Sequence, residues 1–121
     1  MTVLLVLLGG AIGAPTRYLV DVVVQSRHDS VLPWGTISVN VAGSLLLGLV
    51  AGLTYVSDAP TWALTLVGTG FCGALTTFST FSYETVRLAE AGRWRAATGN
   101  VVISLVLGLV AVAIGWELGT L

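Results

Sequence analysis

Hydroxyl and phenyl side chains are interleaved in one short run of the chain, and their chemistry suits an ion. The run reads Thr76, Thr77, Phe78, Ser79, Thr80, Phe81 and Ser82. A hydroxyl group can donate a hydrogen bond to an anion, and the edge of an aromatic ring carries a partial positive charge. Phe78 and Phe81 are three residues apart, so a helix places both rings on one face. The run therefore predicts a weakly attractive path for a small, hard anion.

The chain around this run is too apolar for a soluble domain. It has 121 residues, of which 55% are hydrophobic and 9% are charged, whereas a soluble domain carries about 25% charged residues. From Val31 to Tyr83 the only formal charge is Asp58, and residues 96–116 contain none. We therefore predict an integral, multi-pass protein of the cell (plasma or inner) membrane.

Four segments are long enough to cross a membrane, since a helical span needs about 20 apolar residues. They cover residues 2–24, 34–56, 61–88 and 96–116, so we expect residues 1–121 to form a single transmembrane domain with an all-α fold. The tryptophans, at positions 34, 62, 94 and 116, fall at the ends of these spans, as is typical of the membrane–water interface. The amino-terminal residues lack a basic region, so we expect the first span to be retained rather than cleaved as a signal peptide.

The third predicted span differs from the other three. Residues 61–72 would form a helix only about 18 Å long, which is roughly half of the membrane thickness. Gly68, Gly70 and Gly73 then weaken the helix. We therefore expect a broken helix, with the break near residues 73–77 and free carbonyl and N–H groups that can hold an ion at the middle of the membrane.

Glycine spacing in the first two spans predicts close helix packing. Gly9 and Gly13 form one G-x-x-x-G pair, and Gly48 and Gly52 form another. We expect both pairs to pack helices within the bundle. Four helices are too few to enclose a pore comfortably, which indicates a second subunit.

Two spans carry polar side chains at helical spacing. Asn40 follows Thr36 by four residues, so both lie on one side of the second span. Its amide either makes a helix–helix hydrogen bond or donates into a pore, since an unbonded amide in hydrocarbon is costly. Asn100 and Ser104 form a second polar stripe on the fourth span, and Gly108 follows on the same face.

Several ionisable residues lie within the spans or beside them. Arg17 lies about two-thirds along the first span, where it either extends to the interface, pairs with Asp21, or draws anions into a vestibule. Glu84 and Arg87 are three residues apart and could form a structural pair near the end of the third span. His28 lies in a charged loop, where we expect it to be solvated.

No pattern in the sequence predicts an enzyme. There is no cluster of His, Cys and carboxylate residues for a metal, no nucleophile–base pair, and no glycine-rich loop with a phosphate-binding lysine. Cys72 is the only cysteine, so an internal disulfide is excluded, and we expect a buried, inert thiol. The basic residues are five arginines that form no tract for nucleic acid.

Three motifs resemble those of the small Fluc (CrcB-type) fluoride channels, and the resemblance covers essentially the whole chain. The first motif comprises residues 9–14 with Arg17 and Tyr18, the second residues 34–36 with Val39, Asn40 and Gly43, and the third residues 70–82 with Glu84 and Thr85. The third run is long and unusual, and it is the most specific of the three.

The resemblance implies a dimer of four-helix subunits in opposite membrane orientations, with two fluoride pores and passive fluoride efflux that protects the cell from fluoride toxicity. The implied pore residues are Asn40, Phe78, Ser79, Thr80, Phe81, Asn100 and Ser104. Arg17 and Glu84 match a vestibule or structural arginine and a pore-end glutamate. The backbone carbonyls of Gly73 and Thr76 match positions that hold a structural Na⁺ at the dimer interface. Ala74 stands where many members have glycine, a small change that should leave the break intact.

The charges of the loops predict one preferred orientation. The loops 25–33 and 89–95 contain Arg27, Arg93 and Arg95, whereas the termini and the loop 57–60 contain no arginine or lysine. By the positive-inside rule the termini should face outward. A homodimer of opposite orientations needs a bias near zero, so we predict a heterodimer with an oppositely oriented homologous subunit, with the homodimer as the alternative.

Two other functions remain open from the sequence. A small four-helix multidrug transporter would need a carboxylate in the membrane to exchange protons for cationic drugs, and here no acidic residue lies in the middle of a span. A non-transporting membrane scaffold would use the glycines only for packing. It would leave the hydroxyl-rich third span unexplained.

Overall fold

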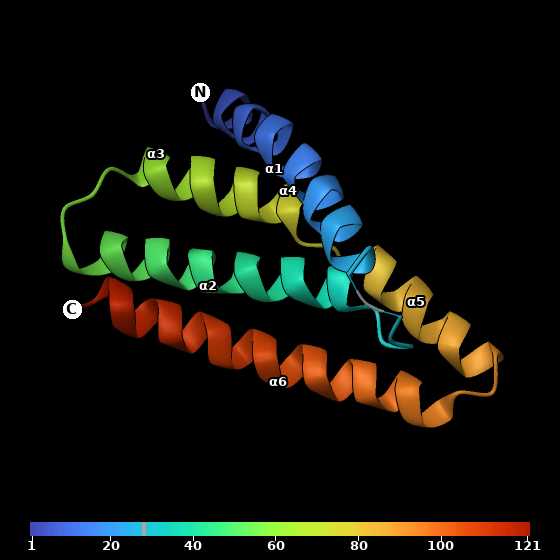
Figure 1. Cartoon of the computed structure of the whole chain (residues 1–121). Coiled ribbons are helices and arrows are strands. Elements are labelled where there is room, and N and C mark those ends of the chain that lie inside the picture. Colours follow the sequence, from blue (N-terminus) through green and yellow to red (C-terminus); the bar gives the residue numbers. More distant parts are fainter. Residues whose placement is uncertain (28) are drawn as a thin grey trace.

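The computed structural model describes residues 1–27 and 29–121, and His28 lies outside the described residues. All of the described elements are helical (Figure 1). They are α1 (Thr2–Gln25), α2 (Trp34–Val56), α3 (Thr61–Ala63), η1 (Leu64–Cys72), α4 (Gly73–Leu75), α5 (Ser79–Glu90) and α6 (Trp94–Gly119). Four stretches are long and apolar enough to cross a membrane, namely Thr2–Gln25, Trp34–Val56, Thr61–Glu90 and Trp94–Gly119. The prediction of an all-α chain with four such helices is confirmed.

The helices form one elongated bundle (Figure 1). Helices α2 and α6 run side by side, and the row made of α3, η1 and α4 lies along the other side of α2. Helix α1 crosses η1 and α4 obliquely, while α5 packs beside the first half of α6. The carboxyl terminus and the connection from α2 to α3 therefore lie at one end of the bundle, and the connection from α5 to α6 lies at the other.

The four glycines of the G-x-x-x-G pairs lie where helix backbones touch. A Cβ atom added to Gly9 would lie 2.7 Å from a peptide nitrogen of η1, and Gly13 also packs on η1. A Cβ atom added to Gly52 would lie 2.7 Å from a carbonyl oxygen of α6, and Gly48 packs on the same helix. The expected packing within the bundle is confirmed, because only a residue without a side chain fits at this separation.

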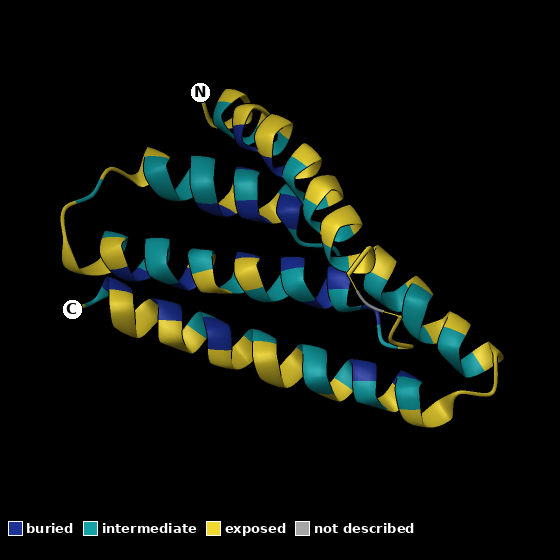
Figure 2. Ribbon diagram, viewed as in Figure 1, coloured by how far each residue is buried: buried dark blue, intermediate teal, exposed yellow. Residues whose placement is uncertain are grey.

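The buried residues lie where α2, η1, α4 and α6 face neighbouring helices, whereas the outer faces of α1 and α6 are exposed (Figure 2). The buried residues with side chains beyond glycine include Thr36, Ile37, Val39, Cys72, Leu75, Ala97, Asn100 and Ala111. Cys72 is a buried free thiol, as the sequence predicts. Since the exposed outer faces are themselves apolar, they suit lipid or a second subunit rather than water.

Element η1 is a π-helix of nine residues, Leu64–Cys72, which the sequence did not indicate. A π-helix has i→i+5 hydrogen bonds and wider turns than an α-helix, and it rarely extends beyond one turn. Gly70 lies within this element, and a Cβ atom added there would lie 3.0 Å from the Val6 carbonyl oxygen of α1. The absence of side chains at glycine lets the widened backbone pack directly against α1.

Residues 76–78 are not helical, since α4 ends at Leu75 and α5 begins at Ser79. Thr76 is extended, with φ −81° and ψ 159°. Gly73–Leu75, which the sequence places inside the expected break, are helical instead. The Thr76 N–H still donates to the Cys72 carbonyl oxygen at 2.9 Å, so regular hydrogen bonding stops only at Thr77.

The side chain of Asn40 forms hydrogen bonds with both backbone groups of Thr77. The Thr77 N–H donates to Asn40 Oδ1 at 2.8 Å, and Asn40 Nδ2 donates to the Thr77 carbonyl oxygen at 3.0 Å. The Thr77 hydroxyl then accepts the backbone N–H of Thr80 at 3.2 Å, in the first turn of α5. Because unbonded backbone groups are costly in a membrane, these bonds determine where the chain can leave α4 and enter α5.

Replacing Asn40 by leucine should lower the free energy of unfolding by about 2–4 kcal/mol, because two backbone groups of Thr77 lose their partners. The measurement is denaturant unfolding of the purified chain in detergent, followed by helical circular dichroism. Ser38→Ala is the control, since it removes a polar group from the same helix and leaves the bonds between Asn40 and Thr77 intact. Equal unfolding curves for the two variants would contradict this account of Asn40.

Candidate anion-binding site

A hollow of about 380 Å³ lies beside the non-helical residues 76–78, between α2, η1, α4, the start of α5, and α6. Four of the predicted pore residues line it, namely Asn40, Phe78, Phe81 and Ser104. Gly73 and Thr76, the positions predicted to hold Na⁺, line it as well. The fold thus brings residues from three of the four spans to one place.

The two phenyl rings meet at the edge of this hollow. Their centroids lie 5.8 Å apart, with the ring planes inclined by 46°. Phe78 precedes α5 and is 77% exposed, whereas Phe81 lies in the first turn of α5 and is half-buried. The inclined arrangement is one that aromatic pairs prefer, and it directs ring edges as well as faces toward the surroundings.

A chain of hydrogen bonds links α6 to α5 behind the hollow. The Ser104 hydroxyl donates to Asn100 Oδ1 at 3.4 Å, and Asn100 Nδ2 donates to the Thr85 hydroxyl oxygen at 2.8 Å. The Thr85 hydroxyl donates in turn to the Phe81 carbonyl oxygen at 2.8 Å. Asn100 is completely buried and does not line the hollow. Its amide therefore holds α5 against α6, and of this pair only Ser104 reaches the hollow.

Thr85 and Thr77 were not among the residues that the sequence selected for the site. Thr85 links Asn100 to the backbone of Phe81, and Thr77 lines the hollow. Thr85 follows Phe81 by four residues, so the sequence already placed both on the same face of a helix. The sequence could not identify its partner on α6, because that contact depends on how the two helices pack.

Ser79 and Thr80 do not line this hollow, although both are exposed. Thr80 lines a second hollow of about 170 Å³, together with Arg17 and Thr77. Thr77 borders both hollows, so the hydroxyl-rich run contributes to two neighbouring spaces rather than to one.

Arg17 and Asp21 do not form the ion pair that their spacing allows. Within residues 1–27 and 29–121 the structure contains no ion pair between them, and Asp21 Oδ1 is buried without a hydrogen-bond partner. The Asp21 carboxylate packs against Gly35 at the start of α2. Arg17 and Asp21 both line the second hollow, together with Thr77 and Thr80.

Glu84 is bound by α2 rather than by its neighbour on α5. Its Oε1 accepts a hydrogen bond from the Thr36 hydroxyl at 2.6 Å. Arg87 instead donates to the Tyr83 hydroxyl at 3.4 Å, so among the described residues the expected pair between Glu84 and Arg87 does not form. Glu84 and Arg87 both line a third hollow of about 440 Å³ near the connection from α1 to α2.

The backbone carbonyls of Gly73 and Thr76 accept no hydrogen bond from a backbone or side-chain donor of the described residues. Unpaired carbonyl oxygens at an interruption of a membrane helix can coordinate Na⁺. No group of three or more His, Cys, Asp or Glu side chains that could hold a metal occurs in the described part of the chain. Peptide carbonyl oxygens are a ligand type that hard cations accept, and these two have no other partner among the described residues.

The main hollow thus offers an ion neutral groups only. Its lining has one amide, four hydroxyls, two phenyl rings and a thiol, and no charged side chain. A path of this kind binds an anion weakly enough to release it again, whereas a buried arginine would hold it.

The chain is similar to a known protein family and to several named proteins. The family model described as CrcB-like protein, Camphor Resistance (CrcB) matches residues 4–116. A protein of Frankia casuarinae named fluoride-specific ion channel FluC 1 is 55% identical over 120 residues, covering 95% of this chain and 93% of that protein. A Nocardia farcinica protein of the same name is 54% identical over 112 residues, covering 93% of this chain and 76% of its own length. A Shewanella baltica protein named fluoride-specific ion channel FluC is 47% identical over 115 residues, covering 95% of this chain and 93% of that protein.

Because the family model matches almost the entire length and the relatives are about half identical, the chain belongs to the CrcB-like family.

Proposed function

We propose that the chain is a subunit of a fluoride channel that lets fluoride leave the cell passively and so protects it from fluoride toxicity. The observation that carries this proposal is the uncharged hollow beside residues 76–78, where Asn40, Phe78, Phe81 and Ser104 meet. The names of the relatives from Frankia casuarinae and Nocardia farcinica support fluoride as the ion.

The physical task of such a path is to replace the water around a compact, strongly hydrated anion. Asn40 Nδ2 carries two hydrogens, and the Thr77 carbonyl oxygen takes one of them. The second hydrogen and the phenyl edges are then the available donors, because the Ser104 hydroxyl already donates to Asn100 Oδ1. Each is weak compared with a cation, so fluoride can move from one to the next. The unpaired Arg17 and the Glu84 carboxylate lie outside this hollow and would act at its approaches.

In this proposal the third span is a broken helix, and two chains in opposite membrane orientations complete two pores. Phe78 supports a second subunit, because its ring is 77% exposed beside hydroxyl groups at the edge of the hollow. The carbonyls of Gly73 and Thr76 would supply two oxygen ligands of a structural Na⁺, and a second chain would supply more. The ion would neutralise carbonyl dipoles where the chains meet.

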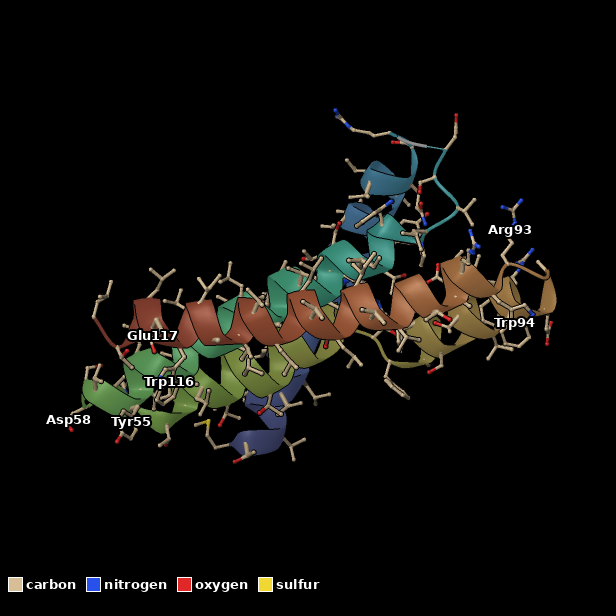
Figure 3. All side chains as sticks on the ribbon, turned by 90° about the horizontal axis from the view of Figure 1, so that it is seen from below. Tyr55, Asp58, Arg93, Trp94, Trp116 and Glu117 are labelled. Carbon is tan, nitrogen blue, oxygen red and sulfur yellow. The ribbon has the colours of Figure 1, made fainter. Side chains whose placement is uncertain are left out.

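The second chain of the proposed dimer is a homologous subunit of opposite orientation. Figure 3 shows Arg93 and Trp94 at one end of the bundle, and Asp58 and Glu117 at the other. The rings of Tyr55 and Trp116 pack together near the acidic end, with centroids 5.2 Å apart and planes inclined by 44°. A charge difference of this kind favours insertion with the arginine-bearing loops inside, which leaves the opposite orientation to another gene product.

Fluoride efflux from liposomes tests the proposal, with a fluoride electrode as the readout. We expect Phe78→Ile and Phe81→Ile to slow efflux at least about tenfold, because an aliphatic group has no positive edge to offer the anion. Phe71→Ile is the matched control, since Phe71 lies on η1 and does not line the hollow. If liposomes with the chain alone release no fluoride, the same variants are measured together with a homologue whose loop charges favour the opposite orientation. No fluoride efflux in either case would refute the channel.

Removal of sodium should weaken the dimer. Replacing Na⁺ by N-methylglucamine at equal ionic strength is expected to raise the monomer fraction in detergent, because the carbonyls of Gly73 and Thr76 lose their cation. Sedimentation of the purified protein, with its partner where one is needed, reports the mass. The same mass in both buffers would contradict a structural Na⁺.

We expect the subunit to insert into the membrane in one orientation only. A reporter fused to the carboxyl terminus is expected outside in nearly all molecules, since Arg27, Arg93 and Arg95 lie in the loops on the opposite side. Changing these three arginines to glutamine should produce a mixture. Comparable amounts of reporter on both sides for the unchanged chain would argue for a homodimer.

A further inference from the structure

The end of the bundle where α5 turns into α6 carries a hollow that the proposed fluoride path does not use. Its volume is about 420 Å³, and it is lined by Val31 and by residues 92–96. Gly92 has a φ of 77°, which favours glycine and lets the chain reverse between Glu90 and Trp94. The short connection places Arg93, Trp94 and Arg95 together around one space.

The positive charge of this hollow is uncompensated. Within residues 1–27 and 29–121 neither the Arg93 nor the Arg95 guanidinium has a hydrogen bond or an ion pair. The first turn of α6 contains no acidic residue. Glu90 lies nearby in the sequence but does not line the hollow. An anion at this place would therefore meet two free arginines and no carboxylate of the lining.

The residues around the hollow are those expected at the level of the membrane surface. Trp94 is the first residue of α6, is 68% exposed, and precedes a stretch apolar enough to span the membrane. Figure 3 shows Arg93 and Trp94 at the extreme end of the bundle. Because tryptophan at the start of a span marks the headgroup region, the two arginines reach the depth at which lipid phosphates lie.

We propose that this hollow binds the phosphate headgroup of an anionic phospholipid, with Arg93 and Arg95 supplying the charge and Trp94 an indole N–H beside them. A lipid is favoured over free phosphate because Val31 and Ala96 give the hollow an apolar border that continues into the membrane-facing part of α6. Exposed arginines alone would hold a free anion only weakly in water. This site is independent of fluoride conduction.

Native mass spectrometry of the purified chain in mild detergent tests the site by counting retained phospholipids. Phosphatidylglycerol and phosphatidylcholine are compared at equal concentration, for the unchanged chain and for R93Q, R95Q and R27Q. The R27Q variant is the matched control, because it removes one exposed arginine from the other loop at this side. We expect R93Q and R95Q each to weaken phosphatidylglycerol retention about fivefold, while R27Q retains it unchanged. Phosphatidylcholine should be retained more weakly by all four.

Three results would overturn the proposal. An equal loss in R27Q would show diffuse attraction to the whole end of the molecule, and equal retention of phosphatidylcholine would show that headgroup charge is irrelevant. Displacement of phosphatidylglycerol by excess inorganic phosphate would assign the hollow to a free anion. All three positions are exposed, and helical circular dichroism of each variant separates a lost site from a lost fold.

Discussion

The two hydrogen bonds between Asn40 and Thr77 are the interaction on which the rest of the third span depends. A membrane offers no water to an unpaired peptide group, so a helix can be interrupted there only where another part of the protein supplies partners. Asn40 supplies both a donor and an acceptor from one side chain. With Thr77 held in this way, Phe78 and Phe81 lie at the hollow instead of continuing a straight helix.

Polar groups also pair with each other at the contact between α5 and α6. Asn100 is fully buried, yet its amide bonds Thr85 and accepts from Ser104, so little hydrogen-bonding capacity is left unused. Buried amides and hydroxyls of this kind hold membrane helices together where apolar attraction cannot. The consequence for the proposed function is that few donors remain for an ion, and those that remain are neutral and weak.

Charge is kept out of the main hollow and placed around it. Arg17 and Glu84 each border another space, and Glu84 is held by Thr36 of α2. Arg93 lies at one end of the bundle, away from Asp58 and Glu117. An arginine at the approach to an uncharged interior can attract an anion from a distance without trapping it inside, because electrostatic attraction acts over a longer range than hydrogen bonds. The Glu84 carboxylate would instead repel an anion.

The sequence by itself determined the membrane class, the four long apolar helices and the glycines at their contacts, because these follow from composition and from spacing along one chain. Gly9 and Gly52 could be assigned to close packing without knowing the partner helix, since a missing side chain serves any close neighbour. Only the tertiary structure decided which polar groups meet. From the sequence, the Asn40 amide could either bond another helix or donate into a pore. Its bonds to Thr77 depend on where α4 ends. Glu84 joins Thr36, and Asp21 packs on Gly35 rather than on Arg17, because the crossing of α1 and α5 over α2 brings these residues together, and spacing within a single helix contains no information about that crossing.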